Sequence, residues 1–240
     1  MERDILLCGR RVRYTLERKP VKNVNLRIKR DGSIWVSASR RVPVSFVEEF
    51  LRSRETFLCR HLQEAEEHPP LGKDQVCFRG MVYTVRAHTG QGKRPAAIEG
   101  KVLHLYLTGG EKLELAVRRW QKNQAEQVFA HALARMLPKI QPYYSAAPRV
   151  ILRRMKARWG SCAVKNNTIT LNLALVGAPD VCIDYVVLHE LCHFVHPNHG
   201  SGFYALLEKL MPEYRECKKK LAAYAPLCIA GGTSDETCMD

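Results

Sequence analysis

Residues 180–199 read DVCIDYVVLHELCHFVHPNH, and this stretch decides how the rest of the chain is interpreted. The run from Val181 to Val195 is apolar on most faces, which predicts a helix buried inside the protein. Asp180 precedes this run and is the expected N-cap of the helix. Pro197 disfavours helical geometry at His196, so we expect the helix to end there and the chain to turn.

Two histidines and a glutamate in this helix have the spacing of a metal site. His189 and His193 lie about 40° apart around the axis and about 6 Å apart along it, so both imidazoles can bind one ion. Glu190 lies about 100° around from His189 and can reach a metal-bound water without being a ligand. Burying these three groups without a metal would be costly. The pattern therefore predicts Zn²⁺ as the cofactor and Glu190 as the general base of a hydrolytic reaction.

A third metal ligand has to come from outside this pair. Three side chains in a row along a straight helix do not easily converge on a tetrahedral ion, which argues against His196. A turn at Pro197 can bring His199 back toward the helix, so His199 is the favoured third ligand. His196, Glu208 and Glu213 remain alternatives.

Three further motifs accompany the histidines: Arg158-Trp159-Gly160-Ser161-Cys162, Thr168-Ile169-Thr170-Leu171-Asn172, and Asn198-His199. With residues 184–193 they resemble the YgjP-like metallopeptidase family, which is related to SprT-like and other minimal zincin proteases. The resemblance is close from about Arg153 to Tyr214 and weaker near the start of the chain.

This resemblance implies a zinc ion held by His189, His193 and His199, with Glu190 as general base. It also implies that the strand around Leu171-Asn172 lies beside the metal helix, where an extended polypeptide substrate could add to the sheet edge.

Hydrophobic periodicity outside the motifs predicts an α+β fold. Apolar residues alternate as in strands at 11–16, 24–29, 34–38, 76–85 and 102–107, with one helix at about 46–67. From residue 111 the spacing becomes helical as far as Pro138 or Pro142, and strands at 150–152 and 168–173 and a last helix at 202–223 follow. We therefore expect a β-rich region with one helix at 1–110, a minimal zincin-like catalytic domain at 111–224 and a flexible tail at 225–240.

The charge of the chain points to acidic partners without choosing among them. The 240 residues carry a formal net charge of +14, and residues 127–179 contain no acidic residue at all. A polyanion or nucleic acid could bind this basic tract, and a solvated face is the alternative. The basic residues of the tract are Arg135, Lys139, Arg149, Arg153, Arg154, Lys156, Arg158 and Lys165.

The nine cysteines are an odd number with no Cys-x-x-Cys pair, which favours free thiols in a reducing cytoplasm. The apolar run Ile5–Cys8 is too short for a signal peptide, and no stretch approaches the roughly 20 apolar residues of a membrane span.

Cys162 or Ser161 could be a nucleophile, but a tight turn with a packed Trp159 and a buried thiol is favoured, because no dedicated base is identifiable. Cys192 is expected in the core.

Three functions fit these observations. The favoured one is a zinc-dependent metallopeptidase, and the second is a metal-dependent hydrolase of nucleotide phosphoanhydrides (a pyrophosphatase). The third is a nucleic-acid-binding protein with structural zinc. Glu190 argues against the third, because a closed structural site has four protein ligands and needs no adjacent base.

Overall fold

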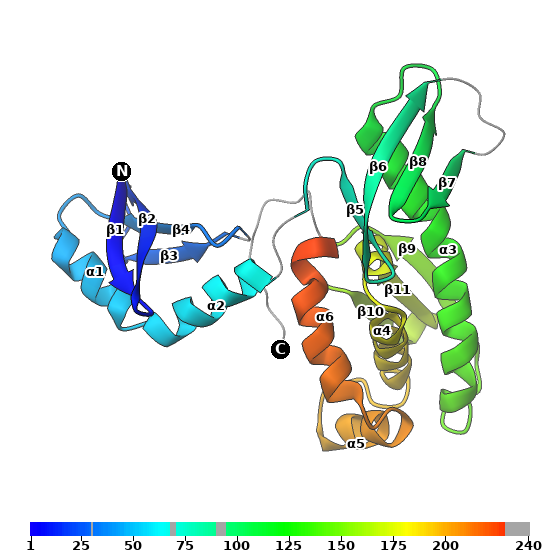
Figure 1. Cartoon of the computed structure of the whole chain (residues 1–240). Helices are drawn as coiled ribbons and strands as arrows, with labels where there is room; N and C mark the ends of the chain where they lie inside the picture. The colour runs from blue at the N-terminus through cyan, green and yellow to red at the C-terminus, as the bar shows by residue number, and fades with distance from the viewer. Residues whose placement is uncertain (30, 68–70, 90–94, 229–240) are drawn as a thin grey trace. The chain divides into compact units, whose positions relative to one another are not determined.

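The structure is a computed structural model that describes residues 1–29, 31–67, 71–89 and 95–228 (Figure 1). It mixes helices and sheets, with six α-helices among the described residues. The chain divides into two compact units, Met1–Pro70 and Leu71–Asp240, and each is described by itself. The boundary expected at residue 110 lies inside the second unit, so the division of the chain into functional domains stays a prediction.

The first unit is a four-stranded sheet that shares its hydrophobic core with two helices. The strand order is β1-β2-β4-β3, in which β2 and β4 are parallel and the other pairs antiparallel. Alternate strand residues such as Tyr14 and Val36 pack against Leu51 and Leu58 of the helices. The elements are β1 (Glu2–Leu7), β2 (Arg10–Arg18), β3 (Asn25–Ile28), β4 (Ile34–Ala38), α1 (Val44–Arg52) and α2 (Glu55–Glu67).

The single helix predicted at 46–67 is two helices, because the chain leaves helical pairing at Ser53. The Ser53 hydroxyl donates a hydrogen bond to the carbonyl of Phe50 at 2.8 Å, a local bond that competes with the helix.

A disulfide joins the β1–β2 turn to α2. Cys8 and Gly9 form this turn with φ of 55° and 69°, the left-handed geometry of a type I′ hairpin. Cys8 bonds to Cys59, whose Cα lies 5.8 Å away. The prediction of free thiols is therefore wrong for this pair, because a tertiary contact across 51 residues leaves no trace in cysteine spacing. The free cysteines in the described ranges are Cys77, Cys162, Cys182, Cys192, Cys217 and Cys228; Cys238 lies outside them.

The second unit begins with another four-stranded sheet, of order β5-β6-β8-β7. Its first turn, Arg79-Gly80, donates backbone hydrogen bonds to the carbonyls of Val176 (2.9 Å) and Gly177 (2.8 Å). A side chain at Gly80 would meet Pro179 at 2.9 Å, so a glycine allows this turn to pack against the segment that ends at Pro179. The strands are β5 (Gln75–Phe78), β6 (Met81–Thr89), β7 (Ala96–Glu99) and β8 (Val102–Leu107).

A second, three-stranded sheet follows the long helix α3 (Leu113–Ile140). Its order is β10-β11-β9, so β11 is central, antiparallel to β10 and parallel to β9. The tight turn expected at Gly160–Cys162 is instead the strand β10, because these residues pair in register with 169–171. The strands are β9 (Arg149–Arg153), β10 (Gly160–Ala163) and β11 (Thr168–Asn172), and the short 3₁₀ segments η1 (Val164–Asn166) and η2 (Leu173–Gly177) flank β11.

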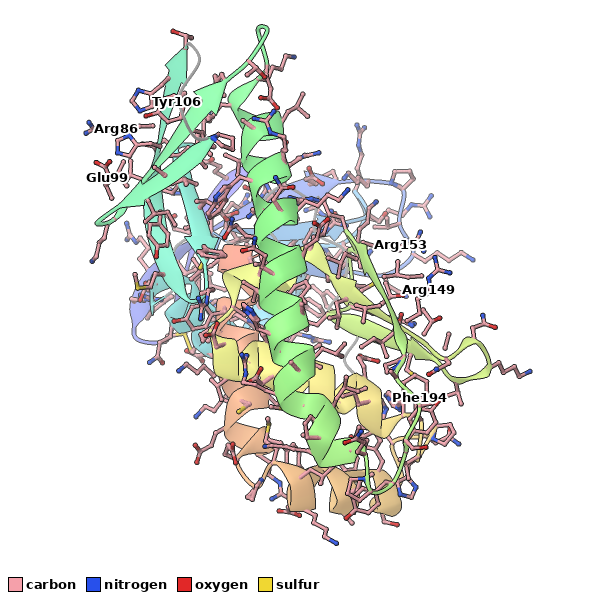
Figure 2. The ribbon with its side chains drawn as sticks, turned by 90° about the vertical axis from the view of Figure 1, so that its right-hand side faces the viewer. Arg86, Glu99, Tyr106, Arg149, Arg153 and Phe194 are labelled. Atoms are coloured by element: carbon pink, nitrogen blue, oxygen red, sulfur yellow. A yellow bond between two sulfur atoms is a disulfide. The ribbon has the colours of Figure 1, made fainter. Side chains whose placement is uncertain are left out.

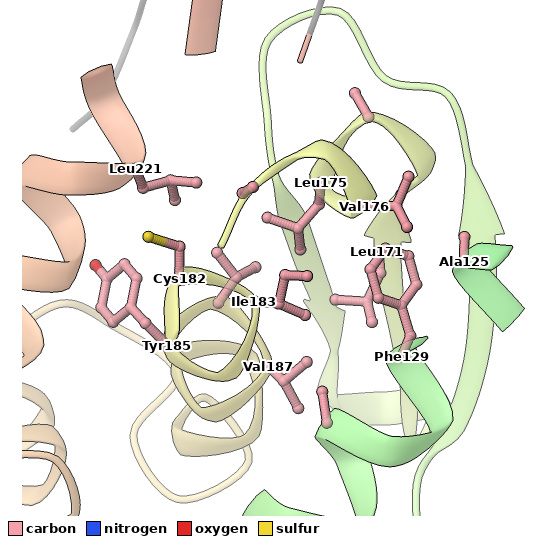
Figure 3. Close-up of a cluster of buried hydrophobic side chains, with 14 of the residues drawn as sticks. Ala125, Phe129, Leu171, Leu175, Val176, Cys182, Ile183, Tyr185, Val187 and Leu221 are labelled. Carbon is pink, nitrogen blue, oxygen red and sulfur yellow. The ribbon is translucent and has the colours of Figure 1, made fainter. Parts of the chain in front are cut away.

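Helix α4 (Asp180–Cys192) contacts α3 on one side and α6 (Tyr214–Cys228) on the other (Figure 1). Figure 3 shows its apolar residues facing α3, β11 and η2: Ile183 and Val187 pack near Phe129, Leu171 and Leu175. The helix is therefore buried, as the sequence predicted.

The helix boundaries differ from those expected. Pro179 occupies the N-cap position of α4, and Asp180 begins the helix and pairs with Arg79 instead of capping. The helix predicted at 202–223 is two helices, α5 (Ser201–Leu210) and α6, since Pro212 has no N–H to donate and disfavours helix at Met211. The tail expected from residue 225 is helical as far as Cys228, and 229–240 lie outside the described residues. No helix among the described residues has the length and apolarity that crossing a bilayer requires.

Candidate metal centre

The three histidines favoured by the sequence lie together. His189 is on the last turn of α4, His193 is its C-cap, and His199 lies just before α5. The Nε2 atoms of His189 and His199 are 3.0 Å apart, and one nitrogen from each of the three rings lies within 4.8 Å of the others. His199 is exposed while the other two are partly buried, so the cluster opens to solvent on one side.

Hydrogen bonding and burial favour the metal-binding form of the His193 and His189 imidazoles. Nδ1 of His193 lies 3.3 Å from the carbonyl oxygen of His196, which can only accept, so Nδ1 carries the proton and Nε2 is free to bind a metal. Burial, with His193 and His199 close by, lowers the pKa of His189 to about 3. Burial also lowers the pKa of His193. Neutral imidazole is the form that binds metal ions.

The turn after α4 brings His199, and not the alternative third ligands, to the other two histidines. The helix ends at Cys192, earlier than the expected end at His196, and the N–H groups of Val195 and His196 both donate to the carbonyl of Cys192. The His196 ring lies against Gly202, where a Cβ would be 3.0 Å from its Cε1. Glu208 forms a salt bridge with Arg215, with 2.6 Å between its Oε1 and the Arg215 Nη1. Within the described residues, neither His196, Glu208 nor Glu213 joins the histidine cluster.

Phe203 of α5 packs against all three histidine rings at nearly equal distances. It is fully buried, and its ring centroid lies 4.9, 4.7 and 4.8 Å from those of His189, His193 and His199. Tyr204 stacks on His199 from another side at 6.1 Å. The sequence marks Phe203 only as an apolar residue of an amphipathic helix, so its contact with the cluster could not be predicted.

Glu190 is buried beside β10. Only 5% of its surface is exposed, and burial raises its pKa to about 8 against the opposing charge of Arg158. A Cβ at Gly160 would lie 2.5 Å from the Glu190 Oε1, so a residue with no side chain is required there. A cation at the histidines would favour the ionised carboxylate that a general base needs.

Asn172 fixes the loop that leads into β10. Its side chain is fully buried and donates to the carbonyls of Met155 (2.8 Å) and Arg158 (2.7 Å). Its Oδ1 accepts from the N–H groups of Met155 (3.2 Å) and Ala174 (3.0 Å). One amide therefore ties the end of β11 to the loop that carries Arg158 toward Glu190.

Among the described strands, β10 is an edge strand of this sheet, and its Gly160 lies against Glu190. β11, which contains Leu171 and Asn172, is paired on both sides and cannot accept another strand. The expectation that a substrate could add near Leu171-Asn172 is thus shifted by one strand, to the edge of β10.

Cys162 does not have the properties of a nucleophile. Burial, together with the charge of Glu190, raises its pKa to about 12, so the thiol stays protonated. Cys192 is fully buried in the core, as expected.

Some arginines of the basic tract bind other residues of the protein, and others remain exposed. Arg135 pairs with Asp184 at 2.6 Å, and Arg154 donates to the Gln121 side chain at 2.9 Å. Arg149 and Arg153 remain exposed at the two ends of β9, and Figure 2 shows both on its outer side.

Three imidazoles around one point, with a buried glutamate next to the first of them in the His-Glu-x-x-His spacing, define the class of metallopeptidases with this histidine pair. A family model, "YgjP-like, metallopeptidase domain", matches residues 22–224. The chain belongs to the YgjP-like metallopeptidase family.

Two solved structures show a local likeness to the chain. The metallopeptidase zymogen abylysin of Pyrococcus abyssi is 26% identical, with 42% of this chain and 94% of that chain covered and a TM-score of 0.35. The zymogen jannalysin of Methanocaldococcus jannaschii is 22% identical, with 42% and 90% covered and a TM-score of 0.34. A search of curated proteins gives no significant match.

Proposed function

We propose that the protein is a zinc-dependent metallopeptidase in which His189, His193 and His199 hold the ion and Glu190 is the general base. The observation that carries this proposal is the meeting of three imidazole nitrogens within 4.8 Å beside a buried carboxylate.

The donor set suits a catalytic zinc site. Three histidines, with no fourth His, Cys, Asp or Glu joining them among the described residues, leave one coordination position open, as hydrolytic zinc sites do. The exposed side of His199 gives solvent and substrate access to this position. A zinc ion held there would polarise a water molecule and the carbonyl of the bond to be cleaved.

Glu190 performs the proton transfers in this proposal. Its carboxylate accepts a proton from the attacking water and then delivers it to the leaving nitrogen. Its burial limits competition from bulk water, and Gly160 leaves the carboxylate the volume that it occupies.

The substrate in this proposal is an extended polypeptide that pairs with the free edge of β10. Unpaired backbone N–H and C=O groups of an edge strand bind an extended chain by main-chain hydrogen bonds, without demanding a particular sequence. The strand directly adjoins Glu190, so a chain bound there passes the base.

The two alternative functions are hydrolysis of nucleotide phosphoanhydrides and nucleic-acid binding with a structural zinc. Exposed Arg149 and Arg153 would suit a nucleotide or a nucleic acid. An open three-ligand site beside a base argues against structural zinc.

The cytoplasmic location stays a prediction, favoured by the free cysteines and not by the Cys8–Cys59 disulfide.

The decisive experiment assays zinc-loaded protein in parallel on an unfolded polypeptide and on nucleoside triphosphates. We expect the polypeptide to be cleaved and Glu190→Gln to lower the rate at least about 100-fold while zinc content stays the same. Triphosphate hydrolysis that depends on Glu190, without cleavage of the polypeptide, would instead establish the phosphoanhydride reaction.

A further inference from the structure

A second cluster of metal-binding groups lies in the first unit, where the β1–β2 turn meets α2. Glu55 and Cys59 are four residues apart on α2 and so share one face of the helix, and Cys8 reaches them from the turn. One ligand atom from each of the three lies within 4.8 Å of the others. The backbone N–H of Cys8 also donates to Oε1 of Glu55 at 2.5 Å, which holds the carboxylate at the turn.

Cys8 is an unusual residue for its position. The left-handed geometry of a type I′ turn favours glycine, asparagine and aspartate, and other residues lose about 1–2 kcal/mol there. Turn preference therefore does not account for Cys8, whereas the contacts of its sulfur do. The partner position, Gly9, has the residue that such a turn prefers.

The donor set is one that zinc uses. Two thiolates and a carboxylate are zinc ligands, with Zn–S distances of about 2.3 Å and Zn–O distances of about 2.0–2.2 Å. Tetrahedral coordination requires the two sulfurs to be about 3.8 Å apart, a separation that rotation of the side chains provides because the two Cα atoms are 5.8 Å apart.

We propose that Cys8, Cys59 and Glu55 form a zinc site when the disulfide is reduced. A phosphine reductant converts the disulfide to two thiols while it takes the oxygen of a water molecule and becomes the phosphine oxide. Binding of Zn²⁺ by these thiols then releases two protons, and the Glu55 carboxylate completes three protein ligands. The turn is thus tied to α2 by a covalent bond under oxidising conditions and by a metal ion under reducing conditions.

Cobalt distinguishes this site from the histidine cluster, because Co²⁺ bound by thiolate shows a sulfur-to-metal charge-transfer band and a site of imidazoles does not. The full chain is measured oxidised, and again after phosphine treatment and anaerobic removal of the phosphine. We expect the reduced protein to bind one more equivalent of Co²⁺ than the oxidised protein in equilibrium dialysis, together with the charge-transfer band.

Two variants assign the signal. Cys8→Ser should abolish the extra equivalent and the band, and Glu55→Gln should retain the band but weaken binding about 10-fold. Cys217→Ser, which changes a buried thiol of the second unit, should bind like the unaltered chain. Because oxidised unaltered protein is itself a control, a variant that fails to fold leaves the test intact. Equal cobalt content and no band in both redox states, or a band that survives in Cys8→Ser, would overturn the proposal.

Discussion

Gly160 and Glu190 occupy one small volume although they lie 30 positions apart in the sequence. The carboxylate fills the space that any side chain at residue 160 would need. Such a contact allows strand β10 and the proposed general base to approach each other directly.

Replacing Gly160 by alanine should therefore damage activity more than stability. The new methyl group would displace the Glu190 carboxylate, and we expect at least about a 100-fold loss of turnover, since general base catalysis depends on position. Gly200→Ala is the matched control, because nothing lies within 4 Å of a Cβ there. The comparison uses steady-state kinetics with zinc content measured for each variant. Equal activity of the two variants would show that the carboxylate tolerates displacement.

His199 and His196 should differ in their effect on metal binding. His199→Ala removes a proposed ligand and should weaken zinc affinity by at least about 100-fold, whereas His196→Ala keeps the carbonyl that orients His193 and should change it less than about 10-fold. Competition with a chromophoric chelator measures both. The reverse order would exchange the roles of the two residues.

The site residues differ in how far the sequence predicts them. His189, Glu190 and His193 lie within five consecutive residues at the end of α4, so their spacing alone predicts an ion shared by the two histidines with a carboxylate nearby. His199 requires a turn, which Pro197 indicates. Phe203, Gly160 and Asn172 act through contacts between elements distant in the sequence, and hydrophobic periodicity carries no information about such contacts.

Among the elements, the start of α4 is held by a turn from another sheet. Arg79 has a φ of 49°, an unfavourable conformation for its side chain, yet its guanidinium makes two hydrogen bonds to Asp180 at the first position of the helix. An acidic residue there also interacts favourably with the helix dipole.

This ion pair should make stability depend on pH in the acidic range. Hydrogen bonding to Arg79, and then its charge, lower the pKa of Asp180. The pair therefore stabilises the fold above the unfolded-state pKa of about 3.9, and this contribution is lost as the pH falls through the lower folded-state value. Both side chains are about half exposed, so we expect at most about 1 kcal/mol. Urea unfolding at pH 6 should show Asp180→Asn to be less stable than the unaltered chain, and this difference should shrink at pH 3.

The sequence predicts β2 and β4, whose burial alternates, and also β9 and β11, whose burial does not. β10 contains Gly160 and Ser161 and has no such alternation, so its pairing with β11 decides its conformation. The breaks in the predicted helices arise at Ser53 and Pro212. Proline predicts the second break by its chemistry, whereas serine indicates the first only weakly.

At the scale of the whole molecule, the two units have separate hydrophobic clusters. Residues such as Tyr14 and Leu51 form one cluster, and residues such as Phe129 and Leu188 form the other, without shared members. All residues of the proposed catalytic site belong to the second unit.

Reducing the disulfide in the presence of a chelator should therefore weaken the first unit alone. The bond closes a loop of about 51 residues, for which loop entropy gives about 4 kcal/mol. Hydrogen exchange followed by mass spectrometry should show reduced protection in residues 1–67 and unchanged protection in 149–192. Loss of protection in both segments would show that the units depend on each other for stability.

The separation of the clusters also bears on how such a chain changes over evolutionary time. Because the two clusters share no residue, we expect a substitution that loosens packing around Tyr14 to leave the packing around Phe129 unchanged, so that no compensating substitution is needed there. We expect the two units to accumulate substitutions at unequal rates, with the slower rate in the second unit, whose packing supports the histidines.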